Sequence, residues 1–120
     1  MRVKWVKHIL AWVCVVLATT LSAQEAQTIS DTEMALGYYK PLAEQGGAYA
    51  QLTIGEIYME GSGVDKNLVQ AYAWFAVAVH QGVDEVEELM KHVFKQLSEA
   101  EQVQARKTAE LYIKNFSAPQ

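Results

Sequence analysis

Residues 48–82 have the sequence AYAQLTIGEIYMEGSGVDKNLVQAYAWFAVAVHQG, and this stretch decides the fold. Apolar residues in its first third recur at spacings of three and four, which predicts a helix over about residues 48–60. A short glycine loop then breaks the chain. A second helix is expected to begin at Asn67, an N-cap residue, and to end at Gly82. The stretch therefore predicts two antiparallel helices joined by a glycine loop.

A twelve-residue pattern occurs twice in and before this stretch. The first copy, ALGYYKPLAEQG, covers residues 35–46, and the second, AYAWFAVAVHQG, covers residues 71–82. The copies align without a gap at an offset of 36 residues, the distance from residue 35 to residue 71. A fixed period of this size indicates an array of supersecondary units that bury their apolar faces against one another. The chain is therefore predicted to be a short helical repeat protein.

The second copy begins with nine consecutive apolar residues, Ala71–Val79. A helix that is apolar on every side must be covered by neighbours on several faces, so this helix is predicted to be central. Trp74 and Phe75 are expected to pack in the core. Gly55, inside the preceding helix, is expected to mark a place where a neighbouring helix passes too close for a side chain. The alternative is that the aromatic pairs of the two copies form ligand platforms.

Further helices are predicted on both sides of this pair. A first helix should run to about residue 45, with a kink or an irregular start caused by Pro41, and a last helix should run to about residue 116. Helix starts are indicated by polar residues three positions apart, of the kind that form capping boxes. These pairs are Ser30 with Glu33, Asn67 with Gln70, Asp84 with Glu87, and Ser98 with Glu101.

No segment has the pattern of a strand. The predicted fold is all-α, an α/α solenoid of about five antiparallel helices within residues 31–116, followed by a tail at residues 117–120. The predicted apolar faces of the first, fourth and last helices comprise Met34, Leu36, Tyr38, Tyr39, Leu42 and Ala43; then Val86, Leu89, Met90, Val93, Phe94 and Leu97; and finally Val103, Ala105, Ala109, Leu111, Tyr112 and Phe116.

Residues 1–23 have the plan of a secretory signal peptide: a basic start, a short apolar run and small residues at the end. Cleavage is predicted after Ala23, with residues 24–30 as a flexible lead-in; the alternative is an uncleaved anchor. The leader contains three of the ten Lys and Arg residues and none of the fourteen Asp and Glu residues, so the remainder has a net charge of seven minus fourteen, or −7. The predicted location is periplasmic or secreted. An acidic exported chain is not expected to bind nucleic acid, or a membrane once the leader is removed.

Residues 48–82 resemble a Sel-one-like repeat, the tetratricopeptide-related helical hairpin of many exported bacterial proteins. One complete repeat is present, preceded by the second half of another and followed by a degenerate hairpin in which Lys91 stands where Gly55 would recur. Asn67 replaces the usual aspartate and keeps the capping chemistry. The resemblance implies a curved scaffold that binds proteins or peptides in the cell envelope. The matching positions are Ala50, Ile54, Gly55, Tyr58, Gly61, Gly63, Val64, Asn67, Ala71, Trp74, Phe75, Ala78 and Gly82.

Some members of the family have been called β-lactamases, so catalytic motifs matter. No serine is followed three residues later by lysine, and the only cysteine, Cys14, lies in the leader. His80 and His92 are twelve residues apart, without metal-ligand spacing, although they could meet and hold a metal with Asp84 or Glu88. The sequence therefore predicts no enzyme activity, no metal and no cofactor; a cell-wall or β-lactam hydrolase is the alternative.

Acidic residues cluster at positions 84–88, where they could bind a cation or a basic peptide. They also suit the start of a helix, whose dipole favours negative charge. The more plausible contact surface is the side of the 48–60 helix that the core positions leave over, where exposed apolar groups beside acids suit an apolar and basic peptide. The alternative is that Leu52 and Met59 only pack on the first helix. The candidate surface comprises Tyr49, Leu52, Thr53, Glu56, Met59 and Glu60.

A further hypothesis is self-association. The first helix belongs to an incomplete repeat, so its open edge could pair with another copy of the chain and make the protein a structural module. The sequence leaves the oligomeric state open.

Overall fold

The computed structural model describes residues 31, 33–61 and 63–119. The predicted signal peptide (residues 1–23), its cleavage site, the lead-in (residues 24–30) and the cap at Ser30 lie outside these residues. Within the described ranges, no helix has both the length and the apolar character needed to cross a membrane.

The described residues are helical nearly throughout and contain no strand, which confirms the all-α prediction. Residues 33–44 form a helix that we call the leading helix. The predicted bounds of the second helix and the predicted end of the last agree with the structure. The labelled elements are α2 (Ala48–Glu60), α3 (Leu68–His80), the short 3₁₀ helix η1 (Asp84–Val86), α4 (Glu87–Lys95) and α5 (Glu99–Phe116).

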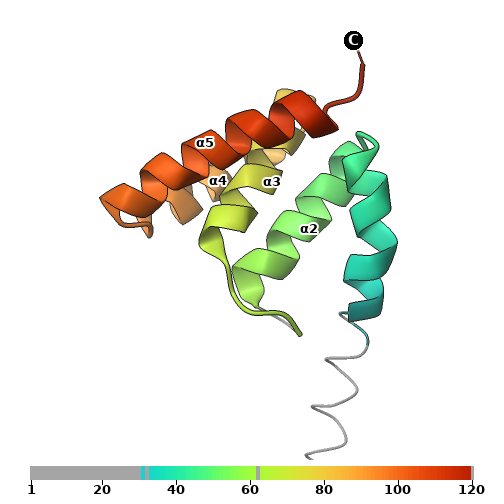
Figure 1. The fold of residues 1–120 in the computed structure, drawn as a ribbon, viewed down its shortest axis with the longest axis horizontal. Coiled ribbons are helices and arrows are strands. Elements are labelled where there is room, and N and C mark those ends of the chain that lie inside the picture. The colour runs from blue at the N-terminus through green and yellow to red at the C-terminus, as the bar shows by residue number, and fades with distance from the viewer. Residues whose placement is uncertain (1–30, 32, 62, 120) are drawn as a thin grey trace, which may run out of the picture.

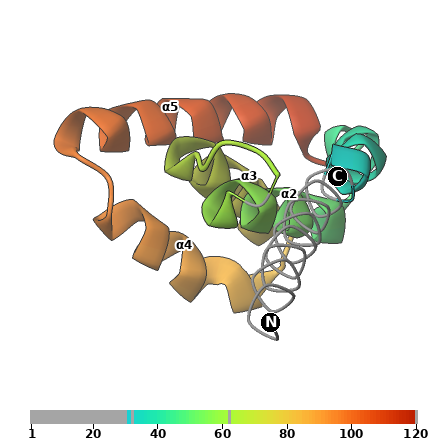
Figure 2. The same cartoon turned by 90° about the horizontal axis from the view of Figure 1, so that it is seen from below.

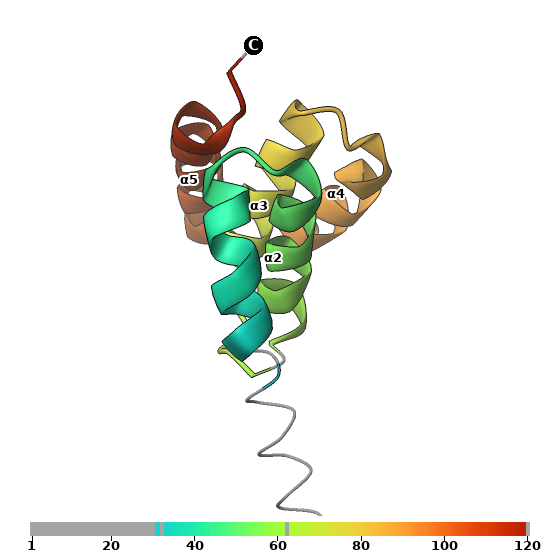
Figure 3. The ribbon, with the colours of Figure 1, turned by 90° about the vertical axis from the view of Figure 1, so that its right-hand side faces the viewer.

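Helix α3 is the central element. It packs against α2, α5 and α4, whereas the leading helix lies beside α2 at one end of the stack (Figures 1 and 3). Helix α5 runs along one side of the α2–α3 pair and α4 along the other (Figure 2). A helix with neighbours on three sides has almost no face left for water, which explains the apolar run Ala71–Val79.

The core consists of two clusters that divide along α3. Phe75 is fully buried in the cluster that α3 forms with η1 and α4. Trp74 is 3% exposed and belongs to the other cluster, where Ala43 of the leading helix and Ile54 of α2 surround it. Adjacent residues on a helix point in directions about 100° apart, so this aromatic pair fills both clusters at once. The predicted core packing of the pair is confirmed.

Gly55 lies at the contact between α2 and α3, beside the ring of Phe75. A Cβ atom at this position would lie 2.5 Å from Cδ1 of Phe75, well inside the ordinary contact distance between carbon atoms. The predicted close approach is therefore confirmed, and the group that requires it is the Phe75 ring. The glycine makes room for the largest fully buried side chain of the core.

The two copies of the twelve-residue pattern end in the same hydrogen-bonded turn. Gly46 and Gly82 have φ angles of 96° and 97°, a left-handed conformation that glycine adopts at little cost. The N–H of each glycine donates to the carbonyl three residues earlier, at 3.1 and 2.9 Å, and the next N–H donates to the carbonyl five residues before it, at 2.9 and 3.0 Å. This is the Schellman motif, which satisfies the last carbonyls of a helix.

Of the three predicted caps that lie within the described residues, one forms completely, one forms in part and one does not form. The Asn67 side chain accepts a hydrogen bond from the Gln70 N–H at 3.0 Å, and the Ser98–Glu101 capping box is complete. The Gln70 side chain does not complete the first cap, because its carbonyl oxygen accepts a hydrogen bond from Tyr112 instead, at 2.7 Å. At Asp84 no side-chain cap forms, because the chain enters α4 through η1.

Several residues assigned to apolar faces are exposed. On α5, Val103 and Leu111 are exposed, and the contact with α3 is made by small and aromatic residues, with Ala105 fully buried. On the leading helix, Met34, Tyr38 and Leu42 face away from the core. The leading helix and α5 lie at the edges of the assembly, so each of them packs on one side only. Their predicted apolar faces were broader than the side that is covered.

Candidate functional site

The structure divides the predicted contact surface on α2 into two parts. Tyr49 is 69% exposed, and Thr53, Glu56 and Glu60 share its side of the helix; we call these four residues the outer face of α2. Leu52 and Met59 instead pack against the cluster formed by α3, η1 and α4. The alternative that they pack on the first helix is wrong, because the leading helix contacts the other side of α2.

The outer face of α2 carries uncompensated negative charge. Partial burial, followed by repulsion from Glu60, raises the pKa of the Glu56 carboxyl above its ordinary value. The only ion pairs among the described residues involve Lys91, so neither carboxylate has a cationic partner among those residues. A cation supplied by another molecule would therefore be favoured at this position.

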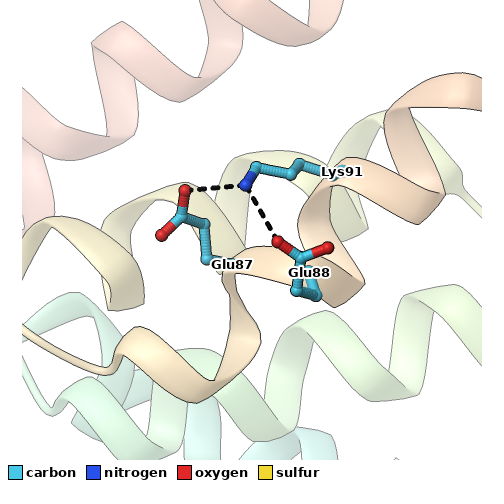
Figure 4. A network of polar contacts seen from close by, with 3 residues as sticks. All are labelled: Glu87, Glu88 and Lys91. Carbon is cyan, nitrogen blue, oxygen red and sulfur yellow. Dashed lines mark hydrogen bonds and ion pairs between the residues drawn. The ribbon is translucent and has the colours of Figure 1, made fainter.

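The acidic residues at the start of α4 are in a different situation. Lys91 lies 3.0 Å from Glu87 and 2.9 Å from Glu88, so one ammonium group is paired with two of the four carboxylates (Figure 4). The hydrogen bond from Lys91 lowers the pKa of Glu88, and the same contact raises the pKa of Lys91. The cluster is therefore compensated in part from within its own helix, whereas Glu56 and Glu60 form no ion pair with a described residue.

His80 and His92 are both exposed, each near the end of its helix. Across the part of the chain that the structure describes, no three histidine, cysteine, aspartate or glutamate side chains are grouped so that they could hold a metal ion.

A pocket of about 390 Å³ opens on the other side of α2. We call it the four-helix pocket, because the leading helix, α2, α3 and α5 all contribute to its wall, together with Asn67 before α3. Its back wall is aromatic: Trp74 stacks on Phe116 with 5.3 Å between ring centroids and contacts Tyr112 at 4.8 Å. The apolar spacing predicts these residues in the core, and no sequence pattern indicates the pocket.

A buried glutamine connects the helices around this pocket by hydrogen bonds. Gln51 is fully buried, and its amide group donates to the carbonyl oxygens of Ala43 and Phe116, at 2.9 and 2.8 Å. Gln81 donates to the Gln51 side chain at 2.6 Å and accepts from the Ala118 N–H at 2.8 Å. The ends of the leading helix, α3 and α5 are thus connected through one side chain of α2, and part of the predicted tail is attached to the fold.

The sequence contained one signal for this network. Gln51 lies next to Ala50 and three residues before Ile54, on the buried side of α2, where a polar residue requires partners. Its partners are backbone carbonyls at helix ends, which no sequence pattern identifies. Only the packing of the leading helix and α5 against α2 brings them within reach.

Comparison with known proteins finds similarity to a solved structure. No protein-family model matches the chain, and no curated protein sequence matches it. The chain is similar to a crystal structure described as a protective antigen present in uropathogenic Escherichia coli strains and displaying an SLR fold, SLR being the Sel-one-like repeat. The TM-score is 0.64 and the sequence identity 33%, over 67% of this chain. The match spans 17% of the length of that protein.

Proposed function

We propose that this chain, a helical-repeat protein with the Sel-one-like repeat fold, is an exported scaffold that binds a protein or peptide partner in the cell envelope through the outer face of α2. Helical repeats of this type are generally associated with protein–protein interaction and are typically not catalytic. The observation that carries the choice of surface is the exposed Tyr49 ring beside two carboxylates that form no ion pair within residues 33–61 and 63–119. The basic and apolar leader supports export.

The chemistry of this surface defines the partner. A tyrosine side chain supplies a large contact area at a small cost in conformational entropy and is frequent among binding hot spots. A lysine or arginine on the partner would be attracted to both Glu56 and Glu60. It would also relieve the repulsion between these two carboxylates. The expected partner segment therefore combines a basic side chain with an apolar one.

The experiment is a pull-down from the native envelope with the exported protein as bait, comparing the wild type with the double variant Tyr49→Ala, Glu56→Lys. The matched control is Leu111→Ala, Glu110→Lys, which makes the same kinds of change at exposed residues of α5. We expect the partner to be recovered with the wild type and the control and to be lost with the double variant. Recovery with all three would eliminate this surface.

Export is tested separately by fractionating cells and measuring the intact mass of the mature protein. We expect the protein in the periplasm or the medium, starting at Gln24. A full-length mass in the membrane fraction would support the anchor alternative instead.

Self-association is a second candidate, and the exposed side of the leading helix favours it. Met34, Tyr38 and Leu42 are spaced four residues apart, so they form one apolar stripe, and all three are exposed. Light scattering at micromolar concentrations distinguishes the candidates: a dimer that Tyr38→Glu converts to a monomer supports self-association, and a wild-type monomer excludes it.

A further inference from the structure

The four-helix pocket is not used by the proposed partner interaction. Its α2 residues, Ile54 and Tyr58, lie on the side of the helix away from Tyr49 and Glu56. A volume of about 390 Å³ is at the small end of the range for small-molecule sites, which span roughly 300–1,000 Å³. The pocket is therefore suited to a compact ligand and not to a folded partner.

Several residues that line the pocket have hydrogen-bond donors without an acceptor in the part of the chain that the structure describes. The carbonyl oxygen of Gln70 accepts from Tyr112, and that of Asn67 accepts from the Gln70 N–H. Both carbonyls are thus occupied, and neither side-chain NH₂ group donates to another described residue. The indole N–H of Trp74 also has no acceptor among the described residues. A ligand that supplies acceptor oxygens would satisfy these groups, as a carboxylate does.

Two exposed residues of opposite charge, Lys40 and Glu44, line the pocket. Lys40 and Glu44 are one turn apart on the leading helix and both contribute to the pocket wall, yet they form no ion pair with each other or with any described residue. The cation can bind a carboxylate, and the anion can bind an ammonium group. The two charges together match a zwitterion, while an anion or a cation alone would meet one favourable and one unfavourable charge.

The aromatic wall offers only a small contact area to a ligand's side chain, because Trp74 is 3% exposed and Tyr112 and Phe116 are half-buried. Tyr112 and Phe116 contact each other at 5.2 Å between ring centroids, and Trp74 packs against both. Their position is maintained by Gln51, which binds the carbonyl of Phe116. An apolar side chain on this wall would leave water and make dispersion contacts with the rings.

We propose that the four-helix pocket binds a free α-amino acid. Lys40 and the amide groups of Asn67 and Gln70 bind its carboxylate, Glu44 binds its ammonium group, and the aromatic wall receives its side chain. This site is separate from the outer face of α2, so either proposal can fail without the other.

The fluorescence of Trp74 provides a measurement of ligand binding in the pocket. The other two tryptophans, Trp5 and Trp12, are in the leader, so the full chain with both changed to phenylalanine has one indole, in the pocket wall. We expect L-leucine to change its fluorescence with a saturable titration. N-acetyl-L-leucine, which lacks the ammonium group, and L-leucinamide, which lacks the carboxylate, should each bind about tenfold more weakly or worse.

Variants identify the groups that recognise the ligand. Lys40→Met and Glu44→Gln should each weaken leucine binding about tenfold. Gln70→Glu keeps the acceptor for Tyr112 but replaces the NH₂ group with a carboxylate oxygen, so it should abolish binding while the thermal unfolding temperature shows that the fold is intact. The controls Lys107→Met and Glu110→Gln, exposed residues of α5 outside the pocket, should bind like the wild type.

Three results would overturn the proposal. These are no fluorescence change with millimolar leucine, equal binding of leucine and its two blocked derivatives, and unchanged binding by Lys40→Met and Glu44→Gln together. Tight binding of N-acetyl-L-leucine alone would also overturn it, since the pocket would then be a simple carboxylate site.

Discussion

The two copies of the twelve-residue pattern have the same local structure and very different surroundings. Each ends a helix with the same glycine turn, to within one degree in φ at Gly46 and Gly82. Yet Tyr38 in the first copy is 67% exposed, and Trp74, its match in the second, is 3% exposed. The difference arises because α3 has neighbours on three sides and the leading helix has one. Local sequence thus determines the turn, while position in the stack determines burial.

The largest expected effect tests this contrast directly. Trp74→Ala should lower the free energy of unfolding by about 3–5 kcal/mol, since it removes a buried ring and leaves a cavity. Tyr38→Ala, at the matching position, should change it by about 0.5 kcal/mol or less. Urea denaturation of both variants measures the difference. Similar values for the two variants would mean that burial does not distinguish the copies.

The next largest effect is a difference in stability between alanine substitutions of two glycines in neighbouring helices. Gly55→Ala should cost about 1–3 kcal/mol, because the new methyl group meets the Phe75 ring. Gly37→Ala should stabilise the protein by roughly 0.5–1 kcal/mol, since nothing lies within 4 Å of the new Cβ and alanine is the better helix former. Ala73 already occupies the matching position of the second copy. A neutral Gly55→Ala variant would show that the Phe75 ring can move aside.

Alanine substitutions of the two glutamines that precede the glycine turns should give a smaller difference in stability. Gln81→Ala removes hydrogen bonds to Gln51 and Ala118, with an expected cost of about 1–2 kcal/mol, because the buried Gln51 oxygen loses its donor. The side chain of Gln45 is exposed and makes no hydrogen bond to another described residue, so Gln45→Ala should be close to neutral. Equal costs in thermal unfolding would mean that the copies use this glutamine in the same way.

The smallest effect concerns α2, which lies between the two copies. Burial and Glu60 raise the pKa of Glu56, so the folded protein binds this proton more tightly than the unfolded chain does. The resulting stabilisation is present below the unfolded pKa and is lost as the pH rises through the folded pKa. Glu56→Gln should therefore slightly stabilise the protein at pH 7 and lose that advantage as the pH falls through the carboxyl range. Denaturation curves across pH measure this, and a constant difference would contradict it.

The elements and the centre of this fold were predictable from particular residues. The bounds of α2 followed from the apolar spacing and the glycine loop, and the Ser98–Glu101 pair marked the start of α5. The apolar run in α3 indicated the central helix. The predicted role of Gln70 in a cap failed because its side chain binds Tyr112, which lies 42 residues away in the sequence.

The candidate sites were less predictable. Helical spacing placed Tyr49 and Glu56 on a free side of α2, but it could not separate them from Leu52 and Met59, which the η1–α4 segment partly covers. The four-helix pocket had no sequence signal, since its residues come from four helices and its wall includes residues expected in the core.

The sequence by itself determined the helices, their glycine ends and the repeat, because these depend on backbone preferences and on contacts between residues close along the chain. Only the tertiary structure decided which apolar residues are covered, which carboxylates stay without a cation, and how Gln51 joins three helix ends. These features depend on groups far apart in the sequence, and their energies arise only when packing brings the helices together.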